Sequence, residues 1–156
     1  MLLAIDLGTK LGWATNSNIG QYSGVQDFKN DRFSGGGMRY LKFEKWLNTM
    51  EKPTQVVFEE VHRHAGTAAA HVYGGLMAVL MKWCEDNAIP YTGVGVGTIK
   101  KHWTGKGNAN KNLMIKKCIE RGYKPADDNE ADAIALRDYW ITNFELETET
   151  LEDLMK

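Results

Sequence analysis

The sequence predicts one α/β domain built on a mixed β-sheet with helices on its faces. Three strand-like segments follow one another near the start of the chain with hairpin-type connections, and later strand-like segments alternate with helical ones. The length of 156 residues suits a single domain with a full-sized core. No internal repeat or linker divides the chain, so we expect one domain over residues 1–145 and an acidic C-terminal tail over 146–156.

Four of the expected strands lie in the first 60 residues. The first is a continuous apolar run that ends in Asp6 and is typical of a buried central strand. Residues 16–18, Asn-Ser-Asn, have hairpin-turn chemistry, and the glycines at 35–37 break the chain before a helix. A second buried apolar run ends in Glu59. We therefore expect strands over 2–6, 11–15, 19–28 and 55–59, and a helix over 38–50.

The remaining residues predict mainly helices. We expect a long helix over 66–86, a strand over 90–96, a helical turn over 98–103, and helices over 111–121 and 128–144. The long helix has one apolar stripe that can face the core, made of Ala68, Val72, Leu76, Val79 and Trp83. A second, outer stripe is also apolar and consists of Ala69, Tyr73, Met77 and Met81. A helix that is apolar on two faces needs two partners. One is the sheet, and the other is either a second subunit or a deeper part of the core.

Composition excludes several classes of protein. The net charge of −1 and the apolar content of 43% are those of an ordinary folded domain. Cys84 and Cys118 have no second Cys or His at zinc-finger spacing, which indicates reduced, packed thiols and a cytoplasmic protein. The first residues have no basic segment of a signal peptide, and the longest apolar stretch is short for a membrane span.

The charges are unevenly distributed along the chain. Residues 99–124 contain eight Lys or Arg and one Glu, a net of +7, whereas residues 128–156 contain nine acids and two bases, a net of −7. This division predicts a basic surface beside an acidic site.

The acidic site is expected at the start of the last helix, where residues 127–132 hold four acids. Asp128 and Asp132 are four residues apart and share a helical face, and Asn129 also lies close enough to share it. Asp127 is expected to be the N-cap and Glu130 to point elsewhere. Acids this dense repel one another unless a cation, a proton or open water relieves the repulsion. A solvated acidic helix start is the alternative interpretation.

Two further acids end buried strands, where α/β sheets form sites. Asp6 is the first, although an Asp there also suits a turn cap that accepts from the amides of Gly8 or Thr9. Glu59 is the second, and Glu60 follows it. Adjacent residues of a strand point to opposite faces, so only one of the two meets Asp6. Because residues 56–58 are all apolar, periodicity does not choose between Glu59 and Glu60.

Carboxylates from two strands and one helix, without a Cys or His cluster, favour hard ions that prefer oxygen ligands, so we expect Mg²⁺ with Mn²⁺ as a substitute. Two such ions roughly 3.5–4 Å apart can clamp a scissile phosphate, with Asp6 as the natural bridging ligand.

The basic segment is then expected to hold DNA. Phosphate contacts are assigned to Lys100, Lys101, Lys106 and Lys111. Lys111 is also placed near the scissile phosphate. Trp103 either stacks on an unpaired base or is a buried anchor. His62 and His64 are either exposed loop residues or take part in proton transfer or DNA contact.

Four segments together resemble the RuvC-type Holliday junction resolvases. They are residues 4–14 around Asp6, residues 57–61 around Glu59, the basic segment from Thr98 through Lys111, and residues 128–136 around Asp132. They follow the family's order and span roughly residues 1–140. The short form of the chain looks most like the RuvC-like resolvases of bacteriophages.

This resemblance implies an RNase H-like fold with helices on both faces of the sheet, a homodimer through the helix around 67–83, and Mg²⁺-dependent cutting of four-way and other branched DNA. The implied metal ligands are Asp6, Glu59 and Asp132. Asn129 stands where the family usually has its fourth acid, and Asp128 is the favoured replacement. Lys100 and Lys111 match the family's two functional lysines. The resemblance to phage proteins also implies a broader role in trimming branched DNA before packaging.

Three alternatives remain. A relative that binds branched DNA without cutting it and an RNase H that cuts RNA in hybrids share the expected fold. The motif Asp6-Leu7-Gly8-Thr9 also opens the phosphate-binding hairpin of the actin and sugar-kinase superfamily, but those proteins need two lobes to enclose ATP.

Overall fold

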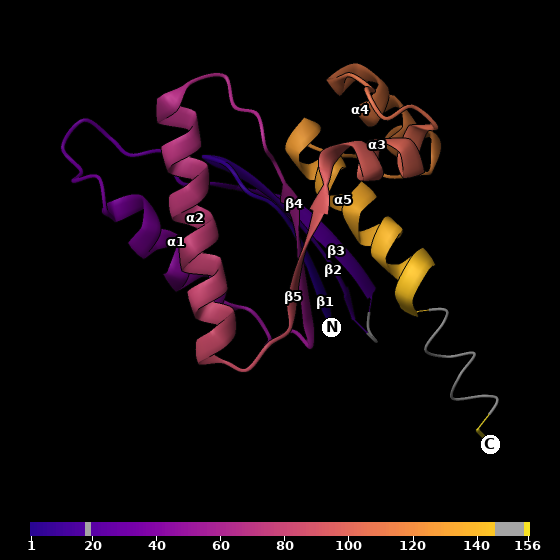
Figure 1. The fold of residues 1–156 in the computed structure, drawn as a ribbon, viewed down its shortest axis with the longest axis horizontal. Helices are drawn as coiled ribbons and strands as arrows, with labels where there is room; N and C mark the ends of the chain where they lie inside the picture. The colour runs from indigo at the N-terminus through magenta and orange to yellow at the C-terminus, as the bar shows by residue number, and fades with distance from the viewer. Residues whose placement is uncertain (18–19, 146–154) are drawn as a thin grey trace.

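The computed structural model describes residues 1–17, 20–145 and 155–156. A five-stranded sheet lies between two helical layers, with α1 and α2 on one face and α3, α4 and α5 on the other (Figure 1). The strands are β1 (Leu2–Asp6), β2 (Lys10–Ser17), β3 (Gly20–Asp27), β4 (Gln55–Glu60) and β5 (Tyr91–Gly95). The helices are α1 (Met38–Thr49), α2 (Thr67–Asp86), α3 (Val96–Thr104), α4 (Lys111–Glu120) and α5 (Asp128–Trp140), which continues into the π-helical turn η1 (Ile141–Glu145).

The strand order is β3-β2-β1-β4-β5, which confirms the mixed sheet expected from the sequence. The β1–β2 and β2–β3 pairs are antiparallel, as hairpin connections require. The β1–β4 and β4–β5 pairs are parallel. α2 connects β4 to β5, and α1 connects β3, which runs in the same direction as β1, to β4. β1 is therefore the central strand, and its apolar residues are covered on both faces.

Alternation along β1 divides the core in two. Leu3 and Ile5 pack with α1 and α2, whereas Leu2 and Ala4 pack with α5. The same alternation in β4 sends Val57 to the α5 face and Phe58 to the other. The next residue after Leu2 and Ala4 in this alternation, and the next after Val57, must therefore also face α5.

The buried face of α2 differs from the predicted one. The helix buries Tyr73, Leu76, Leu80, Trp83 and Cys84. Ala68, which we assigned to the core, is exposed, and Tyr73, which we assigned to the outer stripe, is buried. The Tyr73 hydroxyl donates to the Glu59 carbonyl at 2.8 Å and accepts from the Val61 amide at 3.1 Å. These two bonds explain why this polar aromatic side chain turns inward.

The predicted acidic tail lies mostly outside the described residues, which omit 146–154. Within the described part of the chain, no helix combines the length and the apolar character needed to cross a membrane.

Candidate metal centre

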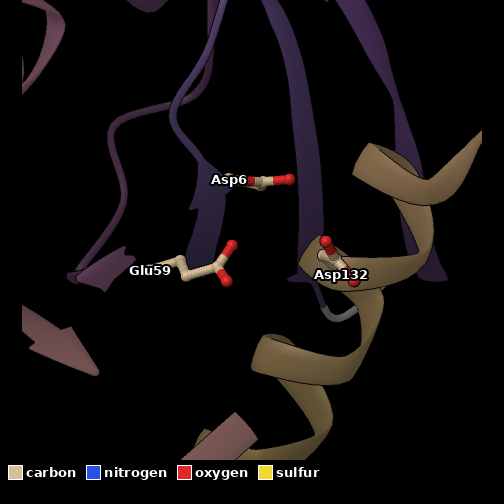
Figure 2. Close-up of side chains that lie close together, drawn as sticks. All are labelled: Asp6, Glu59 and Asp132. Carbon is tan, nitrogen blue, oxygen red and sulfur yellow. The ribbon is translucent and has the colours of Figure 1, made fainter. Parts of the chain in front are cut away.

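Three carboxylates converge where β1 and β4 end beside α5. Asp6, Glu59 and Asp132 each offer an oxygen, and these oxygens lie within 4.8 Å of one another (Figure 2). The three side chains come from residues far apart in the sequence and point toward one common space. Among the described residues, no other group of three His, Cys, Asp or Glu side chains converges in this way.

The sheet register brings the two strand acids together. Ile5 is aligned with Phe58 in the parallel β1–β4 pair, so the next residues, Asp6 at the end of β1 and Glu59 one residue before the end of β4, lie side by side. Glu59 continues the Val57 face toward α5 and is 8% exposed, whereas Glu60 points to the opposite face and is exposed. The structure thereby resolves the choice between Glu59 and Glu60 that the sequence left open.

A glycine in β2 brings α5 to this position. Gly12 is aligned with Asp6 across the antiparallel β1–β2 pair. A Cβ atom at Gly12 would lie 1.9 Å from the Asn129 carbonyl oxygen and 2.9 Å from the Glu130 amide nitrogen. No side chain fits this space, so the first turn of α5 rests directly on the backbone of β2. The close approach places Asp132 one helical turn further along, opposite Asp6.

Capping and hydrogen bonds then fix the start of α5. The Asp127 carboxylate accepts from the Glu130 amide at 2.9 Å, which confirms Asp127 as the N-cap. The Asn129 side-chain amide donates to the other Asp127 oxygen at 3.1 Å. Glu130 is buried and accepts from the Ser23 hydroxyl at 2.8 Å and from the Ala126 amide at 3.0 Å. Glu130 therefore ties α5 to β3, a role that the sequence did not indicate.

The electrostatics of the cluster are unfavourable without a counter-charge. Burial, followed by the charges of Glu59 and Asp132, raises the pKa of Asp6 well above its ordinary value. Burial and the charges of Glu59 and Asp128 raise the pKa of Asp132 to about 8. In addition, the Asp132 Oδ1 atom is buried without a hydrogen-bond partner among the described residues. A buried carboxylate oxygen in this state needs a proton or a cation.

The donors fit a hard divalent cation. All three offer carboxylate oxygens, which are the ligands that Mg²⁺ and Mn²⁺ prefer, and no thiol or imidazole contributes to the group. The Asp-Glu-Asp cluster is consistent with a metal site, as the sequence predicted.

Asp128 lies at the edge of this cluster. Its charge raises the pKa of both Asp6 and Asp132, so its carboxylate is near both of them. It is outside the group of three converging oxygens, and its Oδ2 atom lies 3.7 Å from the Lys111 Nζ atom. The assignment of Asp128 as a fourth ligand stays a prediction.

The predicted basic residues lie on α3, on α4 and in the loop between them. The charges of Lys100 and Lys111 lower the pKa of Asp132, which places both ammonium groups near the cluster. The Lys111 side chain is 81% exposed, and Lys101 and Lys106 are also exposed. These four lysines are thus accessible or partly accessible on the acidic side of the sheet.

Trp103 is the exception among the proposed DNA contacts. It is 2% exposed, and its indole N–H donates to the Met114 carbonyl at 3.2 Å. The Arg121 guanidinium covers the ring at 4.0 Å from its centroid. The ring is therefore the buried anchor that the sequence analysis gave as the alternative, and stacking on a base is not available to it.

The two histidines after β4 differ in their surroundings. His62 is exposed, with its ring 4.0 Å from the Glu60 carboxylate. His64 is half-buried, and its ring centroid lies 4.9 Å from that of Tyr73. Neither belongs to the carboxylate cluster.

Comparisons with known proteins identify the fold. No family model matches the sequence, and no curated protein sequence matches it significantly. A Thermus thermophilus RuvC structure matches with a TM-score of 0.68 and 18% identity, over 90% of this chain and 95% of that one. T. thermophilus RuvC in complex with a Holliday junction substrate matches with a TM-score of 0.64 and 19% identity, over 86% and 88%. The yeast mitochondrial Holliday junction resolvase Ydc2 matches with a TM-score of 0.61 and 12% identity, over 90% and 78%.

These matches, together with the strand order, define the RNase H-like fold of RuvC. At 12–19% identity they establish the fold alone.

Proposed function

We propose that this protein is an endonuclease that depends on a divalent cation and cuts branched DNA, with four-way junctions as its principal substrate. The observation that carries the proposal is the convergence of Asp6, Glu59 and Asp132 within 4.8 Å on a resolvase-like fold. One of the similar structures contains a Holliday junction substrate, which supports the choice of DNA. Of the metals, Mg²⁺ is the first candidate and Mn²⁺ its substitute.

The acids share one task in this proposal. Asp6, Glu59 and Asp132 point toward one common space and would together hold the ion or ions. Bound divalent ions would supply Lewis-acid stabilisation of the pentavalent phosphate and lower the pKa of the attacking water. Asp128, next to Lys111, is the proposed fourth ligand. Burial and the neighbouring acids raise the pKa of Asp6 and of Asp132, so protons would compete with the ion for these carboxylates.

The lysines would hold the substrate around these acids. Lys111 is exposed and lies beside Asp128, a position suited to the scissile phosphate. Lys100, Lys101 and Lys106 would bind flanking phosphates, which gives affinity that depends on salt and carries little sequence information. The substrate preference must therefore come from the shape of the branched DNA.

A homodimer through the helix around 67–83 is part of the proposal. The outer face of α2 leaves Ala68 and Ala69 exposed and Met77 and Met81 half-buried. Two copies joined there would present two sites to opposing strands of a four-way junction. The resemblance to bacteriophage proteins, a role in trimming DNA before packaging, and a cytoplasmic location all stay predictions.

The decisive experiment uses purified protein and an end-labelled synthetic four-way junction, with products resolved on a denaturing gel. We expect cleavage in Mg²⁺ or Mn²⁺ and its loss in Asp6→Asn, by on the order of 10²–10³-fold or more, because a group that stabilises the transition state is removed. The matched control is Glu60→Gln, which removes the adjacent carboxylate that faces away from the cluster. No cleavage in any divalent ion, or undiminished cleavage by Asp6→Asn, would contradict the proposal.

Two alternatives have separate outcomes in the same assay. Junction binding without cleavage in either ion would indicate a non-cutting relative. An RNA–DNA hybrid cut faster than the junction would indicate an RNase H. ATP binding, measured by titration, would favour the actin and sugar-kinase class.

A further inference from the structure

Phe33 is exposed to an unusual degree for a large apolar side chain. It lies in the segment between β3 and α1, which Figure 1 shows as a long loop at the outer edge of the molecule. The ring is 89% exposed, whereas the other exposed aromatic residues, Tyr22 and Phe144, are 51% and 41% exposed among the described residues. Single exposed apolar side chains are common and need no explanation by themselves. The surroundings of Phe33 distinguish it from such a residue.

A hydrogen-bonded turn holds Phe33 in its exposed position. The Asp31 carboxylate accepts from the Phe33 amide at 2.8 Å and from the Ser34 hydroxyl at 3.0 Å. The Ser34 amide also donates to the Asp31 carbonyl at 3.3 Å. These bonds lower the pKa of Asp31, with the Phe33 amide as the first cause, so the ionised carboxylate is the form that the turn favours.

The base of the loop is tied to the turn that follows Asp6. The Phe28 amide donates to the Thr9 carbonyl at 2.8 Å, and the Arg39 Nε–H donates to the Phe28 carbonyl at 3.1 Å. The Phe28 ring is buried and lies 5.6 Å from the Phe43 ring, centroid to centroid. Only Leu7 and Gly8 separate Thr9 from Asp6. The loop therefore leaves the sheet at the end where the acids converge.

The loop carries positive charge next to the ring. Residues 28–42 contain four Lys or Arg and one Asp, a net of +3. The Arg32 guanidinium carbon lies 5.4 Å from the centroid of the Phe33 ring, within the range of a cation–π contact. Arg32 and Lys29 are exposed. With the cation on one side, most of the ring surface remains open to a second planar group.

We propose that Arg32 and Phe33 form a contact site for an unpaired base of the DNA substrate, with Phe33 stacked on the base and Arg32 and Lys29 paired with the adjoining phosphates. Aromatic side chains combined with a positive surface are the recurring means of binding unpaired nucleic acid. One ring is too small an area for a stable protein interface. The inference rests on the proposed function, since the branch point of a junction is where such bases occur.

The test measures binding rather than cleavage. The protein carries Asp6→Asn, so the DNA stays intact, and fluorescence anisotropy reports its affinity for a four-way junction, a single strand and a linear duplex. We expect Phe33→Ala to weaken junction and single-strand binding by on the order of 10-fold or more, and duplex binding by less than 2-fold. Phe33→Trp should retain the affinity, because it keeps the stacking surface.

Two further variants separate stacking from charge and from general effects. Arg32→Gln should weaken binding to all three DNAs and reduce the slope of log affinity against log salt by about 1. Tyr22→Ala, which removes an exposed aromatic residue of β3, should change none of the three affinities.

The outcomes distinguish this inference from the proposed function. Equal junction and single-strand affinities for Phe33→Ala and its parent would overturn the role of Phe33 while the nuclease proposal stands. An equal loss on the linear duplex would also overturn it, because a base in a duplex is not available for stacking. A parent protein that binds the junction no better than the duplex would instead contradict the proposed preference for branched DNA.

Discussion

The two faces of the sheet are built differently. On the α1–α2 face the core consists mostly of large side chains, among them Phe28, Phe43, Phe58 and Trp83. On the α5 face it includes alanines from both the sheet and the helix, namely Ala4, Ala14, Ala131, Ala133 and Ala135. Large side chains bury more apolar area, whereas small ones let a helix approach the sheet closely.

Polar contacts position helices on both faces, through Tyr73 of α2 on one and through Arg137 and Glu130 of α5 on the other. On the α5 face, the buried Arg137 guanidinium donates to the Thr15 and Tyr22 carbonyls at 3.1 and 3.3 Å, and Glu130 accepts from Ser23. These directional contacts fix the rotation and depth of α5, which a purely apolar interface would leave less defined. The acids lie on the face where small residues let α5 approach the sheet and where Arg137 and Glu130 tie it to β2 and β3. We infer that the core of the α1–α2 face contributes most of the folding stability, whereas the core of the α5 face chiefly positions α5 and the acids.

The largest expected effect comes from Gly12→Ala, which breaks the close approach on the α5 face. The new Cβ would overlap the Asn129 carbonyl, so the start of α5 must move by about 1 Å or more. A displacement of this size can cost about 10²-fold in rate. We expect a loss of that order in metal-dependent cleavage and weaker Mn²⁺ binding by calorimetry.

Gly8→Ala is the matched control, because its Cβ would meet only the Lys10 carbonyl at 3.6 Å, an ordinary contact. Full activity of Gly12→Ala would show that α5 can shift without disturbing Asp132, and the division between the two faces would then be wrong.

Leu76→Ala removes a large core side chain from the α1–α2 face. Leu76 is fully buried among the large side chains of the α1–α2 face. We expect a loss of about 2–5 kcal/mol in the free energy of unfolding, from lost burial and the cavity that remains. Urea unfolding measures the loss. Mn²⁺ affinity, measured on the folded variant at low temperature, should stay within 2-fold of the parent; a large change in affinity would show that the two faces are not independent.

Asp132→Asn removes the repulsion between Asp132 and the neighbouring acids on the α5 face. The pKa of Asp132 is about 8 in the folded protein and about 3.9 in an unfolded chain. Between these values the folded state binds more protons, so the free energy of unfolding falls as pH rises from 4 to 8. Without a divalent ion, we expect the variant to be more stable than the parent at pH 8.5 by about 2 kcal/mol or more, and the difference to shrink at pH 5.

Thermal unfolding in a chelator at the two pH values measures this difference. Addition of Mn²⁺ at pH 8.5 should raise the Tm of the parent and leave that of Asp132→Asn nearly unchanged. Parallel pH dependences for the two proteins would show that Asp132 is not the titrating group.

The smallest expected effect concerns the helix that carries Lys111. The Asn110 side chain caps α4 by accepting from the Leu113 amide at 2.9 Å. Asn110→Ala should lower the free energy of unfolding by about 1 kcal/mol. Because Lys111 is the first residue of α4, we also expect a modest loss of junction affinity, within about 5-fold, with no change in Mn²⁺ binding. Asn112→Ala is the control, because it makes the same substitution inside α4 at a residue that does not cap the helix.

Much of the site was predictable from the sequence because strand ends are marked by local patterns. The apolar runs before Asp6 and Glu59 predicted buried strands, and the sheet confirms both. The spacing of the acids at the last helix placed Asp132 on the face that meets them. Asp127 was predictable as a cap because its hydrogen bond is made to a residue three positions away.

What the sequence did not predict depends on contacts between distant residues. The inward turn of Tyr73 requires the backbone at 59–61, and Trp103 is buried by the core of the α5 face together with α4 and Arg121. Gly12 is the one missed residue with a sequence signal, since a glycine inside a strand often marks a close approach of another segment.

The sequence by itself determined that this chain forms a mixed sheet whose strands end in acids, because alternation and apolar runs act over a few residues. Only the tertiary structure decided that Glu59 rather than Glu60 meets Asp6, since the choice depends on which face of β4 the helix α5 covers. It also decided the distance between the acids, through the contact of Asn129 with Gly12, because separations of a few ångströms are set by backbones that pack against each other.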